Sequence, residues 1–498
     1  MSRHCFLLLL FGAASALTVP STLDSQAVFG APSSPADLPH LNPTHSFWTH
    51  GSPDANPLAG TGSTGELTEA ADVCIIGSGI TGVSAAYHLA NAVEHGTFPL
   101  PEGKETLRAV VLEARDFCSG ATGRNGGNLT PYEFSGFRKA EALFGRAAAL
   151  KYYAIEHYSA TEMARIARAG GWADAVDLVE GGHMDVILTP ERLHELEADF
   201  ATALAAGKNV NVTWLDREEM NETYGTYNWG VRSPGYNLWP LKFAAELFNE
   251  ANTTTAKLDL RLHTRTPVTR VAPLSSSLHS FSPRWELSTP RGTIACAYVL
   301  HATNAYASHL LPHLASAIVP VRGQVIALRA AAPLNSTVSW VGNAGYWFPR
   351  PAKEGEPPLV ILGGAREAAG PPFETHTTDD SVVTAAVGEV LRGFLPALFP
   401  RLYEAGREPE REWTGIMGYT ALEIPLVGHV LDPNARENAS TYEGQYMSAG
   451  YAGHGMPRAY ACAEAVVGMI AADARGGGEK WEAPPWFPPP FSTTRMQD

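Results

Sequence analysis

The sequence has no surplus of positive charge. Its 498 residues include 36 Lys and Arg against 51 Asp and Glu, which gives a formal net charge of −15. A basic surface is what a nucleic-acid-binding protein needs, so we expect no nucleic-acid partner. The absence of an internal repeat of roughly 20 to 50 residues argues against a solenoid. With 45% hydrophobic residues the chain can bury a large core, and we expect about two or three domains.

The sequence also lacks an apolar run of membrane-spanning length, so no membrane partner is expected. Residues 1–16 combine a basic start, a short apolar stretch and a small-residue end at Ala14, Ser15 and Ala16. This order is typical of a signal peptide, and we expect cleavage after about Ala16 and secretion. The alternative is a short N-terminal anchor. Residues 17–70 are rich in Pro, Ser, Thr and Gly and predict an extended arm, which Phe47 and Trp48 could pin to the body.

Glycosylation sequons support export. They begin at Asn128, Asn211, Asn221, Asn252, Asn335 and Asn438. Chance would give only about two in a chain of this composition. We expect Asn128 to be unmodified because it lies in a predicted cofactor loop, and the others to face solvent.

The sequence has few cysteines, and their number neither supports nor excludes export from the cell. The leader contains Cys5, and the four that remain are Cys74, Cys118, Cys296 and Cys462, which allow three pairings. A chain of this size can fold without disulfides. Since Cys74 lies in a predicted strand and Cys462 in an Ala-rich helix, we expect both to be small buried hydrophobic residues, with a disulfide as the alternative.

A glycine-rich turn organises the chain. The apolar run 73–76 predicts a buried parallel strand, and Gly77, Gly79 and Gly82 follow it at GxGxxG spacing. Residues 83–92 have the small and apolar side chains of a helix packed closely on a sheet. The helix N-terminus can then hold a pyrophosphate. A second predicted strand, 109–112, ends at Glu113, where a dinucleotide site needs a carboxylate for the ribose hydroxyls; this argues against NADP.

Two further segments have the same character. Residues 298–302 predict a strand that ends in small and hydroxylic residues, and such a strand lets the backbone approach a pyrophosphate. Residues 450–457 form a turn with three glycines that enters an Ala-rich helix, and its first amides can point at a bound group that carries negative charge. His454 lies in this turn, where either a structural role or a ligand contact is possible.

In order along the chain, several motifs resemble the D-amino-acid oxidase/sarcosine oxidase (DAO) superfamily of FAD-dependent oxidoreductases, and most closely its gamma-glutamylputrescine-oxidase-like branch. They are GSGITG (77–82), LEAR (112–115), CSGATGRNGG (118–127), HATNAY (301–306), PVRGQ (320–324) and GYAGHGMPRA (450–459). The resemblance implies an α/β, two-domain (α+β) fold in which a Rossmann-like FAD-binding domain is interleaved with an antiparallel-sheet substrate domain.

Along the chain, the nucleotide-binding segments are interrupted by two segments that predict short strands and turns, which supports this interleaving. The expected divisions are the signal peptide (1–16), the arm (17–70), three FAD-binding stretches (71–175, 237–317 and 411–475), two substrate-domain stretches (176–236 and 318–410) and a Pro-rich tail (476–498).

The resemblance implies a set of FAD-binding residues within these motifs. They are Gly77, Ser78, Gly79, Ile80, Thr81, Gly82, Glu113, Ala114, Arg115, Ser119, Gly120, Ala121, Thr122, Arg124, Asn125, Gly126, Gly127, Val268, Ala302, Thr303, Asn304, Gly450, Gly453, His454, Gly455 and Met456. Val268 enters because residues 268–271 look like the family's adenine-side strand. No metal site is expected.

No catalytic base can be named, because the superfamily shares none. Candidate substrate groups are His454, Tyr346, Arg322, Arg350 and Arg366, of which a planar guanidinium suits a carboxylate. For each arginine the alternative is a solvated strand end or an ion pair.

Departures from the family pattern bear on the flavin linkage. Relatives attach flavin through a cysteine or a histidine at positions that align with Met417 and Asn128 here, so we expect non-covalent FAD. Pro457 replaces a lysine of some members, and Leu422 and Glu423 replace an expected Asp-Gly pair.

The expected function is oxidation of a C–N bond of an amine or amino acid to an imine, with O2 as acceptor and H2O2 as product. The alternatives are a flavin dehydrogenase or tailoring oxidoreductase of a nitrogenous natural product, and a non-catalytic flavoprotein.

Overall fold

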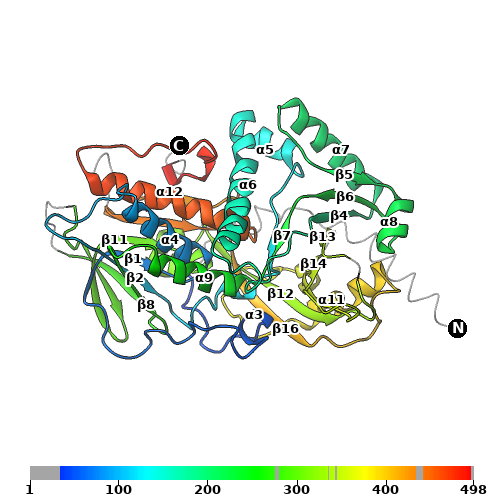
Figure 1. Cartoon of the computed structure of the whole chain (residues 1–498), viewed down its shortest axis with the longest axis horizontal. Coiled ribbons are helices and arrows are strands. Elements are labelled where there is room, and N and C mark those ends of the chain that lie inside the picture. The colour runs from blue at the N-terminus through cyan, green and yellow to red at the C-terminus, as the bar shows by residue number, and fades with distance from the viewer. Residues whose placement is uncertain (1–33, 275–279, 335, 343–344, 433–440, 495–498) are drawn as a thin grey trace.

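The computed structural model describes residues 34–274, 280–334, 336–342, 345–432 and 441–494. The expected signal peptide and the first part of the arm lie outside these ranges. Among the described residues, no helix is both long enough and apolar enough to cross a membrane. Figure 1 shows two sheet regions, with the first sheet and its helices on the left and the second sheet on the right.

The first sheet has eight strands, and its central strands are parallel in the order β18-β11-β1-β2-β8. Antiparallel strands are added at β18 by β17 and at β11 by β10, which pairs with β9. The strands are β1 (Ala70–Ile76), β2 (Leu107–Leu112), β8 (Leu258–His263), β9 (Arg270–Pro273), β10 (Trp285–Thr289), β11 (Gly292–His301), β17 (Leu426–His429) and β18 (Gln445–Ala449). Val268 precedes β9 rather than lying within it.

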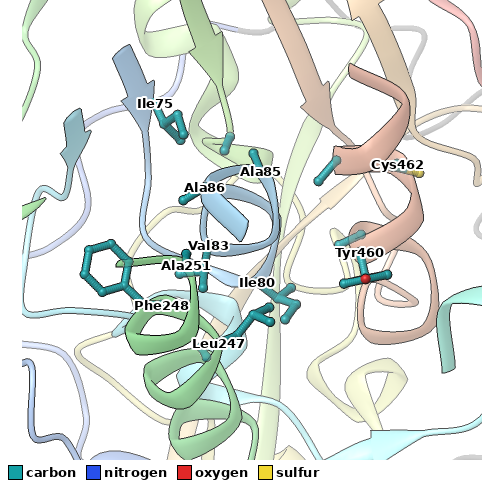
Figure 2. Close-up of a cluster of buried hydrophobic side chains, with 14 of the residues drawn as sticks. Ile75, Ile80, Val83, Ala85, Ala86, Leu247, Phe248, Ala251, Tyr460 and Cys462 are labelled. Atoms are coloured by element: carbon teal, nitrogen blue, oxygen red, sulfur yellow. The ribbon is translucent and has the colours of Figure 1, made fainter. Parts of the chain in front are cut away.

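Three helices pack against this sheet: α4 (Ile80–Glu94), α9 (Pro240–Thr253) and α12 (Met456–Arg475). α4 lies between the other two, and its small residues Ala85 and Ala86 are fully buried. Figure 2 shows α4 side chains meeting Leu247 and Phe248 of α9 on one side and Tyr460 of α12 on the other. The small side chains allow this close approach, as the sequence predicts.

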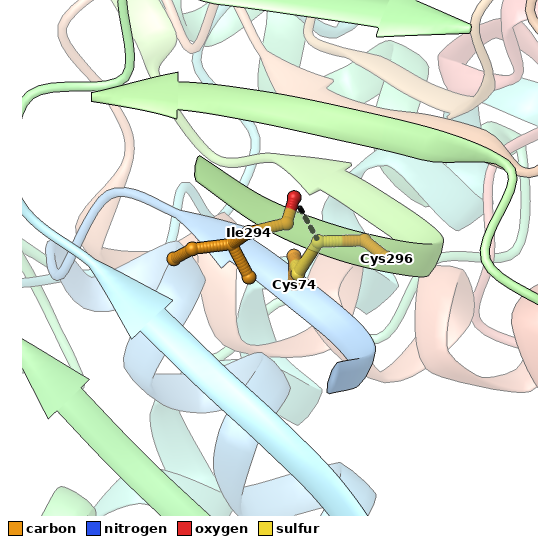
Figure 3. Close-up of a disulfide and its surroundings, with 3 residues drawn as sticks. All are labelled: Cys74, Ile294 and Cys296. Atoms are coloured by element: carbon orange, nitrogen blue, oxygen red, sulfur yellow. Dashed lines mark hydrogen bonds between the residues drawn. A yellow bond between two sulfur atoms is a disulfide. The ribbon is translucent and has the colours of Figure 1, made fainter. Parts of the chain in front are cut away.

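Cys74 of β1 is disulfide-bonded to Cys296 of β11 (Figure 3), with their Cα atoms 6.0 Å apart. The expectation that Cys74 is an unpaired buried residue is therefore wrong. The pairing arises because β1 and β11 are neighbours in the sheet although 222 residues separate the two cysteines. Cys118 and Cys462 are free and buried, as expected for Cys462.

The second sheet has the order β16-β12-β15-β14-β13-β4-β6-β5. All its pairs are antiparallel except β13 with β4. Its strands are β4 (His183–Ile187), β5 (Thr213–Leu215), β6 (Trp229–Ser233), β12 (Val319–Arg329), β13 (Ser339–Gly342), β14 (Gly345–Pro349), β15 (Leu359–Gly364) and β16 (Arg411–Tyr419). The mixed α/β, two-region fold confirms the expected fold class.

One strand departs from the expected division of the chain. Residues 411–419 were expected in the third FAD-binding stretch, but they form β16 at the edge of the second sheet. Its register with β12 extends from Val319 opposite Tyr419 to Ala327 opposite Arg411. The chain therefore returns to the first sheet only at β17.

The remaining helices surround the second sheet or connect the two sheets. They are α3 (Phe47–His50), α5 (Phe137–Phe144), α6 (Arg146–Ala169), α7 (Pro190–Ala205), α8 (Arg217–Tyr224), α10 (Ala307–Leu310) and α11 (Ala385–Leu398). α5 and α6 are the two helices predicted within 136–172. α6 stands between the two sheet regions in Figure 1 and also packs on α12. A short ribbon of β3 (Asn128–Leu129) and β7 (Tyr236–Asn237) lies nearby.

Candidate functional site

A cavity of about 550 Å³ lies where the carboxyl ends of the first sheet's parallel strands meet the second sheet. Open α/β sheets bind ligands at this edge. Its walls come from the turns that follow β1, β2 and β11, from the N-terminus of α12, and from strands β12, β14 and β16. The interleaved segments therefore converge on one space.

The turn after β1 leaves room for backbone alone. A Cβ on Gly77, whose φ is +110°, would lie 2.6 Å from the Ala302 carbonyl oxygen, and one on Gly82 would lie 1.9 Å from the Gly77 oxygen. Gly79 is the N-cap of α4 and supplies no side-chain cap. The Ile80 amide donates to Thr122 Oγ1 at 2.9 Å, so the amides that follow it in the first turn of α4 are the ones left for an anion at the positive end of the helix dipole.

Glu113 directly follows β2 and is held by its neighbours. Its Oε2 accepts hydrogen bonds from the Ser78 backbone N (3.0 Å) and Oγ (2.8 Å), and its Oε1 accepts from Arg115 N (2.9 Å). Ser78 lies behind the carboxylate and does not line the cavity. The sequence therefore places a fixed carboxylate at the edge of the cavity, where a ribose hydroxyl could donate to it.

Two buried arginines, Arg115 and Arg124, share the carboxylate of Asp380. Arg115 Nη1 lies 2.9 Å and Arg124 Nε 3.4 Å from its oxygens. Burial lowers the pKa of Arg124 to about 10, although the charge of Asp380 opposes this shift. Arg124 also donates to the Thr414 carbonyl oxygen, which ties the loop of residues 118–127 to β16 of the second sheet.

The second sheet contributes aromatic and cationic groups. Arg366 Nη1 lies 3.2 Å from Tyr419 Oη, and the guanidinium lies 5.2 Å from the centroid of that ring. Burial raises the pKa of Tyr346 to about 12, so its hydroxyl stays protonated near neutral pH. Met417 lines the same wall.

His454 lines the cavity at the start of α12 and is held from behind. Its ring is stacked on Tyr132, with centroids 4.2 Å apart, and its Nε2 lies 3.2 Å from Glu156 Oε2. Glu156 is fully buried and also accepts a 2.8 Å hydrogen bond from Arg458 Nε. Burial would raise the pKa of Glu156, but His454, Arg458 and hydrogen bonds lower it to about 2.

The structure brings most of the expected FAD-binding residues to this cavity. Four of them, Ser78, Gly82, Ser119 and Gly450, do not line it and instead shape the turns behind the wall. Of the five candidate substrate groups, His454, Tyr346 and Arg366 line the cavity.

Arg322 and Arg350 lie outside the cavity, which corrects the expectation for both. Arg322 forms an ion pair with Glu374, and its Nη1 donates to the Asp379 carbonyl oxygen at 2.9 Å. Arg350 forms an ion pair with Asp177 and is enclosed by three aromatic rings of Phe47, Trp48 and Trp239, at 5.1–5.5 Å from their centroids. Both side chains are ion-paired outside the cavity, as in the ion-pair alternative.

Several cavity residues carry no signal in the sequence. Leu38 and Pro39 come from the arm, and Tyr132 and His183 come from segments with no motif. Glu156 belongs to an amphipathic helix, where a polar residue is ordinarily solvent-facing. The glycine-rich spacing alone could have found none of them.

The polar groups around the cavity fit FAD. Five side-chain atoms in its wall are buried without a hydrogen-bond partner: Asn128 Oδ1, Thr303 Oγ1, Tyr306 Oη, His309 Nε2 and Arg366 Nε. Buried polar atoms are ordinarily paired, so these atoms indicate a polar ligand. Two helices, α4 and α12, begin at the cavity without a side-chain cap. This donor set suits a diphosphate at one helix and a flavin at the other.

Comparison with known proteins agrees with this geometry. A family model described as "FAD dependent oxidoreductase" (DAO) matches residues 72–469. The chain is 25% identical over 410 residues to "Probable oxidoreductase OrdL" of Rhizobium meliloti (strain 1021), covering 79% of this chain and 81% of the relative. It is 25% identical over 424 residues to "Gamma-glutamylputrescine oxidoreductase" of Escherichia coli (strain K12), covering 83% and 85%.

Solved structures share the fold. Glycine oxidase from Geobacillus kaustophilus superposes with a TM-score of 0.62 at 20% identity, covering 86% of this chain and 99% of that one. L-Amino acid deaminase from Proteus myxofaciens gives a TM-score of 0.61 at 14% identity, covering 89% and 97%.

Proposed function

The chain belongs to the DAO family of FAD-dependent oxidoreductases, and from this premise we propose that it oxidises a C–N bond of an amine or amino acid to an imine. Water then hydrolyses the imine, and O2 reoxidises the reduced flavin with release of H2O2. The names of similar proteins, a gamma-glutamylputrescine oxidoreductase and a glycine oxidase, support an amine or amino-acid substrate.

One part of the cavity wall is suited to hold the cofactor, and another part is suited to bind the substrate. The turn after β1 and the carboxylate of Glu113 would hold the diphosphate and ribose of FAD, and the N-terminus of α12 would face the flavin. When bound, FAD supplies an acceptor for a hydride equivalent. The side chains of the second sheet would bind and orient the substrate and exclude water from it.

The position of Arg366 in the cavity wall is the observation on which the proposal mainly rests. It is the candidate arginine that lines the cavity, its Nε is buried without a partner, and Tyr419 positions its guanidinium. A planar guanidinium binds a carboxylate through two parallel hydrogen bonds.

His454 is the second polar group suited to the substrate. Glu156 and Tyr132 fix the orientation of its ring. A neutral amine is the form that can be oxidised, and the ring of His454 is a polar group that could hydrogen-bond the substrate nitrogen.

Anaerobic mixing with a library of amines and amino acids tests the reaction. A substrate should bleach the flavin absorbance, and admission of air should restore the colour with one H2O2 per turnover. Bleaching without H2O2 on aeration would favour a dehydrogenase or a tailoring enzyme. No bleaching by any compound would favour a non-catalytic flavoprotein.

Arg366→Lys tests the carboxylate contact once a substrate is known. Lys keeps the charge but loses the planar pair of donors, so KM for an amino acid should rise by about ten-fold or more. The matched control is the amine that lacks the carboxylate, whose KM should change little. Equal effects on both compounds would contradict a carboxylate contact.

We further propose that the protein is secreted. The sequon residues Asn211, Asn221 and Asn252 are exposed, and the Cys74–Cys296 disulfide is typical of an oxidising compartment. Asn128 lines the cavity, whereas Asn335 and Asn438 lie outside the described residues. Expressed from its own N-terminus in a secreting eukaryote, the protein should appear in the medium, begin near Leu17 and lose mass on deglycosylation. Retention in the cytosol with Met1 intact would refute secretion.

A further inference from the structure

The arm crosses the edge of the first sheet above the cofactor cavity. Ala36 N donates to Ser308 Oγ at 2.9 Å, and the Ala36 carbonyl oxygen lies 3.1 Å from His309 Nδ1. Both partners belong to α10, which follows β11. Four residues later, the His40 carbonyl oxygen accepts a 3.0 Å hydrogen bond from Arg115, which follows β2. β1 lies between β2 and β11, so this segment passes over the end of β1.

The arm is fastened again beyond His40. Thr44 N donates to the Asp380 carbonyl oxygen at 2.8 Å, and Thr44 Oγ1 accepts from Arg124 Nη2 at 2.6 Å and from Thr414 N at 2.9 Å. Arg124 and Asp380 are the buried charges that hold the cofactor loop. The arm therefore completes the hydrogen bonding of this buried network.

A third fastening joins the arm to the cofactor loop itself. Ser46 Oγ donates to the Gly123 carbonyl oxygen at 2.6 Å, and Trp48 Nε1 donates to the Asn125 carbonyl oxygen. Ser46 and Trp48 are both fully buried. Exposed linkers rarely bury their side chains so completely, so this segment is an integral part of the folded domain.

Between Ala36 and His40, the side chains of Leu38 and Pro39 form part of the cavity wall. They stand between Ala36, which is bonded to α10, and His40, whose carbonyl oxygen accepts from Arg115. Both side chains are apolar and only half-buried in the protein. A ligand in the cavity would remove their remaining apolar surface from water.

We propose that residues 36–48 form a strap over the dinucleotide and are part of the FAD-binding site. The matched family model begins at residue 72, after the strap. Leu38 and Pro39 cover the diphosphate half of FAD, and the fastenings to α10, Arg115 and the cofactor loop hold them in place. FAD leaves only when residues 36–40 lift from the cavity. This inference rests on FAD binding and not on the proposed substrate.

Two leucines of the arm make a matched test. Leu38 lines the cavity, whereas Leu41 is 80% exposed. Holoprotein is diluted, and the fluorescence of released FAD gives the dissociation rate constant. Leu38→Ala should release FAD about ten-fold faster than the parent, because it loses apolar contact with the cofactor. Leu41→Ala should stay within about two-fold of the parent, as expected of an exposed side chain.

A second measurement on the parent does not depend on any variant folding. Amide hydrogen exchange of residues 36–48 should be markedly slower with FAD bound than after FAD is removed and should slow again when FAD is restored. Equal dissociation rates for the two leucine variants, or exchange that FAD does not change, would overturn the strap. A parent protein that binds FAD but oxidises no amine would refute the proposed reaction and leave the strap standing.

Discussion

At the scale of single residues, Asp380 is the point where the parts of the cofactor site meet. Its carboxylate faces two arginines: Arg115, which follows β2, and Arg124, which ends the 3-10 turn of residues 121–124. Its carbonyl oxygen accepts a hydrogen bond from the backbone N of Thr44 in the strap. The exposed fractions of the three charged side chains are 5% or less. Buried charges are costly unless each is paired, so the three side chains are interdependent.

Gly79→Val should give protein without yellow colour. A Cβ at this position would lie 3.3 Å from Thr122 Oγ1, and the branched side chain would project toward the amides that hold the diphosphate. Absorbance of the purified protein at flavin wavelengths measures the loss. The matched control is Gly393→Val, since a Cβ there meets no atom within 4 Å. Retention of FAD at the parental level by the Gly79 variant would contradict the interpretation of this turn.

Glu156→Gln should destabilise the protein by about 3–5 kcal/mol near neutral pH, because Arg458 would keep a buried, uncompensated charge. The pKa of Glu156 is lowered to about 2 in the folded state, below its value in the unfolded chain. Its stabilising contribution is thus complete above about pH 5 and is lost as pH falls toward 2. The difference in free energy of unfolding between variant and parent should shrink over that range.

Urea unfolding at a series of pH values measures this difference. The control is Glu479→Gln, which removes a half-exposed carboxylate paired with Arg475 and should cost under about 1 kcal/mol. A difference for Glu156→Gln that stays constant from pH 7 to pH 3 would show that the carboxylate does not act through its charge.

The residues that the sequence predicts well are those whose role is set by local backbone. Gly77 must adopt a positive φ, and Glu113 must directly follow a strand, and both requirements are visible in a few consecutive residues. The role of Arg350 depends instead on Asp177, Trp48 and Trp239, which are remote in sequence. No local pattern distinguishes an arginine that binds a ligand from one with such partners.

At the scale of elements, the Cys74–Cys296 disulfide joins two neighbouring strands whose ends both reach the cofactor cavity (Figure 3). The double substitution of both cysteines by Ala should lower the free energy of unfolding by about 2–5 kcal/mol, because the disulfide closes a long loop in the unfolded chain. Chemical denaturation with and without a thiol reductant measures the effect.

The reductant should destabilise the parent and leave the double variant unchanged. Cys462→Ala is the control, since Cys462 is buried and free, and it should not alter sensitivity to the reductant. Equal stability of parent and double variant under non-reducing conditions would mean that the disulfide contributes nothing to folding.

Most strands and helices follow from periodicity and composition, including the small-residue helix α4 and the pair α5 and α6. β16 does not, because its residues alternate as any half-buried strand does, and only pairing with β12 decides which sheet it joins. The strap is also unpredictable at this level. Its sequence has no period, and its order comes from hydrogen bonds to elements that are distant in the chain.

At the scale of the whole molecule, FAD should be held without a covalent bond. Met417 and Asn128 line the cavity at the positions where relatives supply a linking cysteine or histidine, and neither side chain forms a stable flavin link. Cys118 is fully buried, and burial raises the pKa of its thiol well above the ordinary value. The reactive thiolate form is therefore suppressed.

Acid precipitation should release all the yellow colour into the supernatant, and chromatography should recover intact FAD. Colour that remains with the pellet would point to another linking residue, and the histidines of the cavity wall, His183, His309 and His454, would be the first to test.

The strap also sets an order of events during synthesis. Thr44 bonds to Asp380 and Thr414, which lie 336 and 370 residues further along the chain. At about 5–20 residues per second, Thr44 emerges on the order of twenty to seventy seconds before these partners exist. Phe47 and Trp48 likewise lack two of their packing partners, Trp239 and Arg350, until those parts of the chain have been made. The first segment of the folded domain to leave the ribosome is thus among the last to reach its place, and the cofactor pocket closes only when nearly the whole chain has been made.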